Sequence, residues 1–265
     1  MSLENYVASW GDAHRYSPAP RHRRRLIAAW LRGLRFSDCL DAGCAQPYLL
    51  EKLQRHRIAA FGCDISGEVI RRNKIRFPDA RFEQFDLVQQ AWPGGRRFDL
   101  VVCSEVLEHV EDWGAALANL TRMSRRHLLI TVPGGKIRPI DRHIGHLRHF
   151  EGAELVTALR NHGLDAIRLR RWGWPMHSIY KRAINGIMPE QVYRTFGEQE
   201  YGFWKKLLSQ IINIAFYAND IFPWGNQLLI LARRQYSGRS AGLTAEGQAS
   251  DENGAIESDR RRGIS

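Results

Sequence analysis

The chain has 265 residues, of which 44% are hydrophobic and 25% are charged. This composition is typical of a globular protein and excludes fibrous, collagen-like and wholly disordered chains. No apolar run approaches the ~20 residues that a helix needs to cross a bilayer. The amino-terminal residues include acids and no apolar segment, unlike a secretory signal, so we expect a cytoplasmic protein. The four cysteines form no C-x-x-C pair, which favours buried thiols in a reducing compartment.

The formal net charge of +11 favours anionic partners such as nucleic acid, phospholipid headgroups or a phosphorylated substrate. Basic residues are concentrated in one stretch that contains no acidic residue: Arg21, Arg23, Arg24, Arg25, Arg32 and Arg35. This stretch is interpreted either as part of an anion-binding surface or as the solvated face of a helix.

An amino-terminal helical cap is predicted for residues 1–37. Pro18 and Pro20 are expected to interrupt the chain, and residues 21–34 then have the apolar spacing of an amphipathic helix. The apolar residues of this helix are expected to face the core: Leu26, Ile27, Trp30, Leu31 and Leu34.

Strands and helices alternate from residue 38 onward. The expected strands cover residues 39–42, 58–63, 81–85, 98–103, 127–132, 164–170 and 227–232. The expected helices cover residues 48–56, 68–77, 112–125 and 151–162. This alternation predicts an α/β fold with a seven-stranded, mostly parallel sheet and helices on both of its faces.

A segment rich in aromatic residues interrupts the alternation before the last strand. Residues 172–226 are predicted to form a helical insertion in a domain that spans 38–235, and residues 236–265 a disordered tail. The insertion is expected to act as a substrate lid or to make a homodimer contact. Its stretch 203–222 combines apolar residues with a pair of lysines, so peripheral contact with the inner face of a membrane is an alternative.

Acidic residues follow several of the expected strands. Asp41 precedes Gly43, Asp64 follows Asp41 by 23 residues, and Asp86 follows the third strand. In an open parallel sheet, ligands bind beyond the carboxyl ends of the strands, and an acid about 20 residues after the glycine loop binds ribose. The sequence contains neither G-x-G-x-x-G nor a phosphate loop. It therefore favours a ligand with ribose and adenine but no pyrophosphate, such as S-adenosylmethionine.

Three segments of the sequence carry a family resemblance. They are DAGCAQPYLL, FDLVVCSEVLEHVED and HLRHFEGAELVTALRNHGLDAIRLRRWGWP. They resemble the first motif (D-x-G-C-G-x-G), the fourth-strand motif and the last-helix region of class I S-adenosylmethionine-dependent methyltransferases, in the branch of the ubiquinone-biosynthesis O-methyltransferases. The resemblance covers residues 38–170 and 227–232. It implies a Rossmann-like fold and a methyltransferase that uses S-adenosylmethionine.

The first motif departs from the family pattern at two positions, because Ala45 and Pro47 replace its second and third glycines. Ala45 is interpreted as a small change. Pro47 can open the next helix at its first turn, where no amide donor is needed. A non-catalytic binding protein with the same fold therefore remains an alternative.

The resemblance implies cofactor contacts for ten residues: Asp41, Gly43, Cys44, Ala45, Asp64, Ile65, Asp86, Leu87, Ser104 and Glu105. In this family Asp64 is expected to bind the ribose, Ile65 to pack on the adenine, and Asp86 to hold the adenine edge. The substitution Asp64→Ala is expected to abolish cofactor binding while leaving the fold intact.

Glu105, Glu108 and His109 have the spacing of residues on one helical face. The same E-x-x-E-H pattern is associated with a metal in small-RNA 2′-O-methyltransferases and ubiquinone-pathway O-methyltransferases, so this set is a tentative Mg²⁺ site. We favour the alternative that Glu108 and His109 bond to neighbouring loops without a metal. His109, His146 and His149 are candidate catalytic bases, because imidazole titrates near neutral pH.

The expected reaction is methyl transfer to an oxygen or nitrogen of a small-molecule acceptor, such as a metabolite, a sugar, a lipid-linked intermediate or a natural product. An RNA 2′-O-methyltransferase with a divalent metal is an alternative. The net charge and the E-x-x-E-H pattern support it, but no RNA-binding module is recognised. Nucleic acid is therefore not the favoured partner.

Overall fold

The computed structural model describes residues 15–54, 56–89, 92–186 and 200–235. Contacts divide the chain into a unit of Met1–Gln235 and a unit of Tyr236–Ser265. The predicted disordered tail, residues 236–265, and the first part of the predicted cap lie outside the described residues. The division into cap, domain, insertion and tail therefore stays a prediction.

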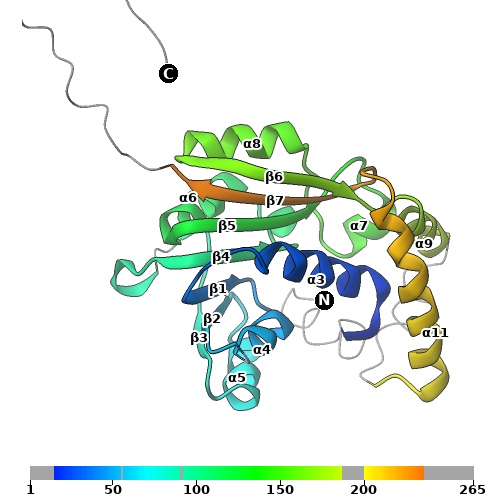
Figure 1. The fold of residues 1–265 in the computed structure, drawn as a ribbon, viewed down its shortest axis with the longest axis horizontal. Helices are drawn as coiled ribbons and strands as arrows, with labels where there is room; N and C mark the ends of the chain where they lie inside the picture. The colour runs from blue at the N-terminus through cyan, green and yellow to red at the C-terminus, as the bar shows by residue number, and fades with distance from the viewer. Residues whose placement is uncertain (1–14, 55, 90–91, 187–199, 236–265) are drawn as a thin grey trace, which may run out of the picture. The chain divides into compact units, whose positions relative to one another are not determined.

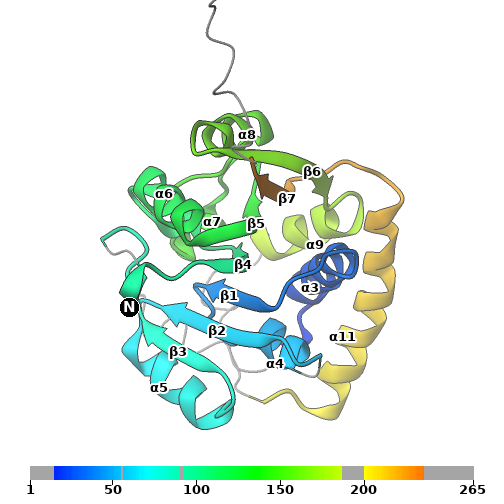
Figure 2. The same cartoon turned by 60° about the vertical axis from the view of Figure 1, so that its left-hand side comes forward.

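Seven strands form one sheet in the order β3-β2-β1-β4-β5-β7-β6, as Figure 1 and Figure 2 show. Their bounds are β1 Asp38–Ala42, β2 Ala59–Asp64, β3 Arg81–Gln84, β4 Phe98–Ser104, β5 Ser124–Pro133, β6 Leu164–Trp172 and β7 Gln227–Arg234. The first five strands pair in parallel, and β7 runs antiparallel to both β5 and β6. The predicted seven-stranded, mostly parallel sheet is confirmed.

Helices lie on both faces of this sheet. Within the described residues, the helices longer than one turn are α3 Pro18–Leu31, α4 Tyr48–Gln54, α5 Gly67–Arg76, α6 Trp113–Met123, α7 Pro139–His143, α8 Gly152–Asn161, α9 Met176–Asn185 and α11 Phe203–Ala215. The 3₁₀ helices are η1 Pro93–Gly95, η2 Leu107–His109 and η3 Phe216–Asp220. α9, α11 and η3 give the described part of the insertion the helical character that the sequence predicts. None of the described helices is long and apolar enough to span a membrane.

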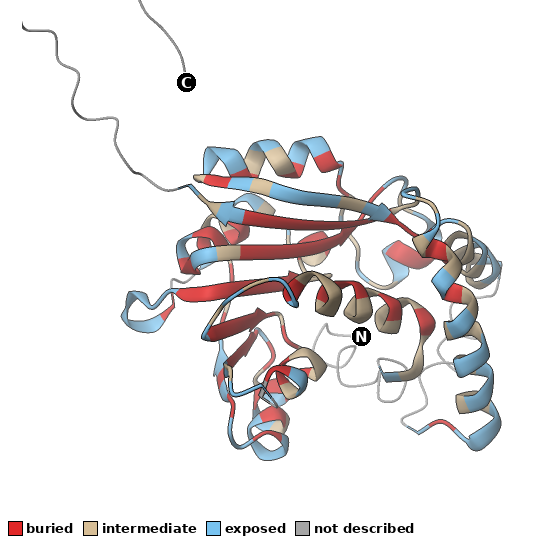
Figure 3. Ribbon diagram, viewed as in Figure 1, coloured by how far each residue is buried: buried red, intermediate tan, exposed pale blue. Residues whose placement is uncertain are grey.

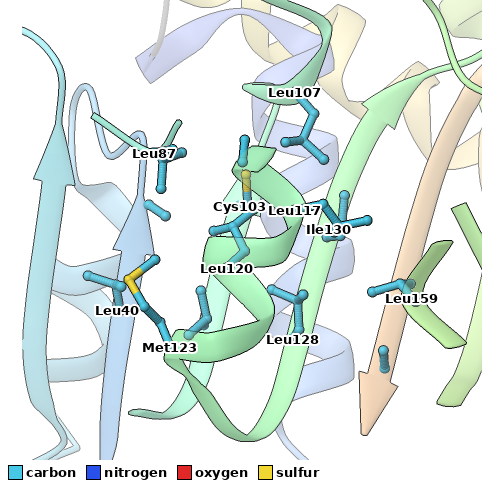
Figure 4. Close-up of a cluster of buried hydrophobic side chains, with 14 of the residues drawn as sticks. Leu40, Leu87, Cys103, Leu107, Leu117, Leu120, Met123, Leu128, Ile130 and Leu159 are labelled. Atoms are coloured by element: carbon cyan, nitrogen blue, oxygen red, sulfur yellow. The ribbon is translucent and has the colours of Figure 1, made fainter. Parts of the chain in front are cut away.

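The core has two layers because alternate strand residues point to opposite faces of the sheet. Leu100 and Val102 of β4 belong to a cluster with α3, α4 and α5, whereas Val101 and Cys103 belong to a cluster with α6 and α8. Figure 3 shows the buried residues along the strands, and Figure 4 shows the α6 side of the core. Burial on both faces explains why the middle of β4, Leu100–Cys103, is apolar at every position.

α3 begins earlier than the sequence indicated. Pro18 and Pro20 do not interrupt the chain, because they lie in the first turn of α3, where a missing amide leaves no helical hydrogen bond unmade. Three residues of the predicted apolar face, Leu26, Ile27 and Leu31, are buried, as expected.

Candidate functional site

A cavity of about 350 Å³ opens at the carboxyl ends of β1, β2 and β4, where the strand order reverses. All ten residues for which cofactor contacts are expected line it, and so does His109. Its volume falls in the range of about 300–1,000 Å³ that is usual for pockets of small ligands. The parallel sheet thus brings together side chains that lie up to about 65 residues apart in the sequence.

The loop after β1 lets the backbone approach this cavity closely. Gly43 has a φ of +73°, and a Cβ atom at this position would overlap the side chain of Val106. The amides of Gly43 and Cys44 both donate to the carbonyl oxygen of Cys63, at 2.8 and 2.9 Å. Glycine is therefore required at position 43 by both conformation and space.

Asp64 holds two neighbouring loops in place. Its Oδ1 accepts a hydrogen bond from the Ser66 amide and its Oδ2 accepts one from the Ala45 amide, both at 3.0 Å. Replacing Asp64 with alanine would leave these two amides without that acceptor. The expectation that Asp64→Ala leaves the fold intact therefore does not follow from the structure.

The buried carboxyl groups of Asp41 and Asp64 line the cavity and contribute negative charge to it. Burial, together with the negative charge of Asp64, raises the pKa of Asp41 to about 7. Burial also raises the pKa of Asp64, although its hydrogen bonds to the amides of Ser66 and Ala45 oppose the shift. The charged form of each group is thus poorly solvated, and a cationic ligand would stabilise it.

The adjoining part of the cavity is apolar. Ile65 lines the cavity and is 60% exposed, whereas Leu87 is buried. Asp86 turns its Oδ1 to the Val88 amide, from which it accepts a hydrogen bond of 2.8 Å. An exposed isoleucine at a cavity edge is suited to packing against a flat ring.

Glu105 joins the end of β4 to α3. Its backbone has a φ of +58°, and its amide donates to the Thr131 carbonyl oxygen at 2.9 Å. Its Oε1 accepts a bond of 3.1 Å from the Thr131 hydroxyl, which Ser104 also contacts at 2.8 Å. Its Oε2 lies 2.6 Å from Nη1 of Arg23. Ser104 and Glu105 are therefore held rigidly beside the cavity.

The three candidate bases lie together, but only His109 is among the residues that line the cavity. The Nδ1 atoms of His109 and His149 lie 3.1 and 3.2 Å from the carbonyl oxygens of Gly145 and Gly135, so each carries a proton and donates. His146 then donates through Nδ1 to Nε2 of His149, at 3.1 Å. The ring of His146 meets His109 edge-on at 4.8 Å.

Each of these three imidazoles is held in its neutral form. Burial is the largest cause that lowers the pKa of His109, His146 and His149, and for His146 the pKa falls to about 3. The Nε2 atom of His109, opposite its bonded Nδ1, therefore retains a lone pair at neutral pH.

Glu105, Glu108 and His109, the candidate metal ligands, do not lie on one helical face as expected. Only Leu107–His109 is helical, as the 3₁₀ helix η2, so Glu105 does not share a helical face with Glu108 and His109. Glu108 and His109 instead group with His146, with ligand atoms within 4.8 Å of one another. A second such group combines Asp141 with His146 and His149.

Glu108 is completely buried, and neither carboxylate oxygen meets a hydrogen-bond donor of another described residue. Burial raises the pKa of Glu108 to about 8. The expected hydrogen bonds from its side chain to neighbouring loops are therefore not formed within the part of the chain that the structure describes. Glu108 contacts the loop through its backbone, since its carbonyl oxygen accepts from the Leu147 amide at 2.8 Å.

A family model described as a methyltransferase domain matches residues 13–177. The chain belongs to this methyltransferase domain family. The ubiquinone biosynthesis O-methyltransferase of Coxiella burnetii (strain RSA 493) is 30% identical over 132 residues, which cover 48% of this chain and 53% of the relative. That of Klebsiella pneumoniae is 27% identical over 147 residues, covering 51% and 56%. This chain therefore spans about half the length of the curated relatives it matches.

Solved structures show the same fold as this methyltransferase domain. The N-methyltransferase NodS from Bradyrhizobium japonicum, in complex with S-adenosyl-L-homocysteine, matches with a TM-score of 0.56 and 20% identity, covering 88% of this chain and 96% of NodS. The magnesium protoporphyrin IX methyltransferase from Synechocystis, also with bound SAH, matches with a TM-score of 0.52 and 17% identity, covering 81% and 83%. The Rossmann-like fold expected from the sequence is thus confirmed.

This methyltransferase domain has alanine where the family motif has its second glycine. Ala45 has a φ of +38°, and its carbonyl oxygen accepts a bond of 2.8 Å from the Asn73 side chain. The change is therefore not small, because an L-residue is strained in this region. Pro47 directly precedes α4, and its carbonyl oxygen accepts from the Glu51 amide at 3.1 Å. Pro47 is compatible with the start of this helix, as expected.

Sequence reasoning did not identify the contribution of α3 to the methyltransferase cavity. α3 lines the cavity with Pro20, Arg23, Arg24 and Ile27. The signal in the sequence is the acid-free run of arginines on an amphipathic helix, which is typical of an anion-binding surface or a solvated face. In the structure Arg23 pairs with Glu105, and the Arg24 guanidinium lies 5.0 Å from the ring centre of Tyr48.

Proposed function

We propose that this methyltransferase domain transfers a methyl group from S-adenosylmethionine to an oxygen or nitrogen of a small-molecule acceptor. The observation that carries the proposal is that Asp41, Gly43, Asp64 and Ile65 line one cavity. The proposal is further supported by the curated relatives, which are ubiquinone biosynthesis O-methyltransferases, and by similar folds with bound S-adenosyl-L-homocysteine.

The residues of the cavity fit the chemistry of this cofactor. Asp41 and Asp64 provide negative charge for a ligand that carries a sulfonium and an ammonium group. Gly43 lets a ligand approach the backbone, and the exposed side chain of Ile65 provides an apolar surface for an adenine ring. Asp64 still has lone pairs for ribose hydroxyls, since a carboxylate offers about four acceptor positions and two are used.

When bound, the cofactor supplies a methyl group on a positively charged sulfur. His109 provides a neutral imidazole whose Nδ1 is fixed by Gly145, so its Nε2 is free to take a proton from an acceptor hydroxyl or amine. Arg23 and Ile27 of α3 line the cavity and limit the access of water to it. Alignment of the two reactants inside the cavity supplies much of the acceleration.

Calorimetric titration with S-adenosylmethionine tests the cofactor assignment. The full chain is expected to bind one equivalent, and Ile65→Arg is expected to weaken binding by about tenfold or more, through lost apolar packing and added positive charge. Ile75→Arg is the matched control, because Ile75 is 72% exposed and does not line the cavity. The assignment would be contradicted if the unmodified chain did not bind S-adenosylmethionine, or if Ile65→Arg and Ile75→Arg lost the same amount of affinity for it.

Transfer of a labelled methyl group tests the reaction itself. With labelled S-adenosylmethionine and a panel of phenols, catechols and amines, the label is expected to enter a small organic product. His109→Gln is expected to lower the rate about 10²-fold with little change in cofactor affinity. If no acceptor in the panel or in cell extract takes the label although the cofactor binds, the non-catalytic alternative is favoured.

A metal-assisted reaction is a second candidate, and the observation that favours it is the buried carboxylate of Glu108, which meets no hydrogen-bond donor of another described residue. Glu108, His109 and His146 would hold a divalent ion, which would lower the pKa of an acceptor hydroxyl. Titration with Mg²⁺ and Mn²⁺ tests this: an ion that binds the unmodified chain but not Glu108→Gln supports it. No binding of either ion supports the metal-free reaction.

The remaining expectations about partners and location stay predictions. RNA is disfavoured as a substrate because described arginines of α3 are engaged in contacts within the protein: Arg23 with Glu105, and Arg25 with Asp220. Salt-sensitive retention of the chain on RNA would reverse this preference. A homodimer and a cytoplasmic location also remain predictions.

A further inference from the structure

α11 is an amphipathic helix whose apolar side faces outward. None of its residues is buried, and Figure 3 shows much of its surface as exposed. Its exposed large apolar residues are Phe203 (72%), Trp204 (77%), Leu207 (42%), Leu208 (57%), Ile211 (58%) and Ile214 (70%). At 100° per residue these six side chains occupy one continuous side of the helix. We call this side, with these six residues, the apolar face of α11.

The polar side of α11 contacts the rest of the protein instead. The Gln210 side-chain oxygen accepts a bond of 2.9 Å from Arg21 of α3, and the Asn213 amide donates to the Tyr16 carbonyl oxygen at 3.3 Å. The Lys206 ammonium lies 5.3 Å from the ring centre of Tyr16. A surface helix normally buries its apolar side, so this reversed orientation calls for an apolar partner beyond the residues that the structure describes.

The apolar surface continues beyond the end of α11. Tyr217, Ile221 and Trp224 are 56%, 70% and 61% exposed, and Ile179 of α9 is 53% exposed. Both α9 and α11 contact η3. Exposed apolar surface of this kind marks sites of contact with other proteins or membranes.

The charge around the apolar face distinguishes between these partners. The formal net charge of the chain is +11. The sequences of α3, α9 and α11 contain eight Lys or Arg residues and no Asp or Glu, although three of these basic residues pair with acids of other segments: Arg23 with Glu105, Arg25 with Asp220 and Lys181 with Asp141. Lys205 and Lys206 lie on the other side of α11, where their ammonium groups are 5.0 and 5.3 Å from the ring centres of Tyr201 and Tyr16. A second copy of the chain would bring two such basic sets together and would be repelled, whereas an anionic surface would be attracted.

We propose that the apolar face of α11 docks on an anionic lipid bilayer. α11 lies in the plane of the interface, with its Phe, Trp, Leu and Ile side chains at the acyl boundary, and the net positive charge of the chain favours anionic headgroups. The aromatic residues Phe203 and Trp204 at the start of the helix, with Tyr217 and Trp224 after it, suit the headgroup level. The proposal does not depend on the proposed methyl transfer.

Vesicle flotation tests the docking surface. The full chain is mixed with vesicles of phosphatidylcholine alone, or of equal parts phosphatidylcholine and phosphatidylglycerol, and is expected to float with the mixed vesicles only. The double substitution Leu208→Asp and Ile211→Asp is expected to lower the partition coefficient by about tenfold or more. Ile75→Asp is the control, because it introduces an aspartate at an isoleucine of α5 that is 72% exposed and lies outside the apolar face of α11.

Other outcomes would overturn the proposal. The proposal is wrong if the unmodified chain does not float with the mixed vesicles. It is also wrong if the double variant floats with them as well as Ile75→Asp does. A concentration-dependent dimer in analytical ultracentrifugation, abolished by the double substitution and without flotation, would assign the face to a second copy. Titration of the same samples with S-adenosylmethionine keeps the questions separate, since failure of cofactor binding with intact flotation would remove only the proposed function.

Discussion

Ala45 has a positive φ at a position where the family motif has glycine. Its φ of +38° costs an L-residue about 1–2 kcal/mol, and glycine would avoid that strain. Ala45→Gly is therefore expected to raise the free energy of unfolding by about 0.5–1 kcal/mol in urea denaturation, after the greater chain entropy of glycine is included.

Ala42→Gly provides the control for this substitution, because Ala42 is buried in β1 and has no positive φ. It is expected to lower the stability by about 1 kcal/mol. A loss of stability on Ala45→Gly similar to that on Ala42→Gly would show that position 45 is not strained.

Asp41 gives the cofactor affinity a defined dependence on pH. Its pKa is about 7 in the free protein, and a bound cation favours the carboxylate, so binding lowers that pKa. The affinity for S-adenosylmethionine should therefore be highest above pH 7 and fall as the pH drops below it, by up to about tenfold per pH unit.

Calorimetric titrations between pH 6 and 8.5, a range chosen around the pKa of about 7, measure this dependence. Asp41→Asn should bind more weakly and should show a much flatter profile over the same range, since it cannot titrate. If the unmodified chain shows a flat profile as well, Asp41 does not face the cation.

The element that connects the cavity to the insertion is α3. Arg23 pairs with Glu105 of the β4 loop, while Arg21 contacts Gln210 of α11 and Arg25 pairs with Asp220 of η3. The helix itself was predictable from its apolar spacing. Its placement over the cavity was not, because these partners lie about 80 to 200 residues away in the sequence and no local pattern encodes such contacts.

Arg23→Met tests whether α3 is tied to the cavity by this ion pair. The Arg23 and Glu105 side chains are only 14% and 22% exposed, so the variant leaves a poorly solvated carboxylate and should lose about 2 kcal/mol of stability. Adding Glu105→Gln should restore part of the loss in a double-mutant cycle. Arg32→Met is the control, because Arg32 is exposed and directly follows α3; this substitution should change the stability by about 0.5 kcal/mol or less.

For the molecule as a whole, the sheet was predictable because apolar strands alternate with amphipathic helices, and the cavity because parallel strands end at one edge. Asp41, Asp64 and Ser104 lie at the carboxyl ends of β1, β2 and β4 and line one cavity, as the sequence indicated. Backbone conformations such as that of Ala45 and the reversed orientation of α11 were not predictable. They depend on contacts with Asn73 and with α3, which only the folded chain brings together.

A crystal structure of the full chain with S-adenosyl-L-homocysteine is the most direct measurement of the central claim. We predict the nucleoside in the cavity, with its ribose hydroxyls within hydrogen-bond distance of Asp64 and its adenine beside Ile65 and Leu87. A nucleoside bound elsewhere, or a cavity left empty at saturating concentration, would contradict the assignment of this site.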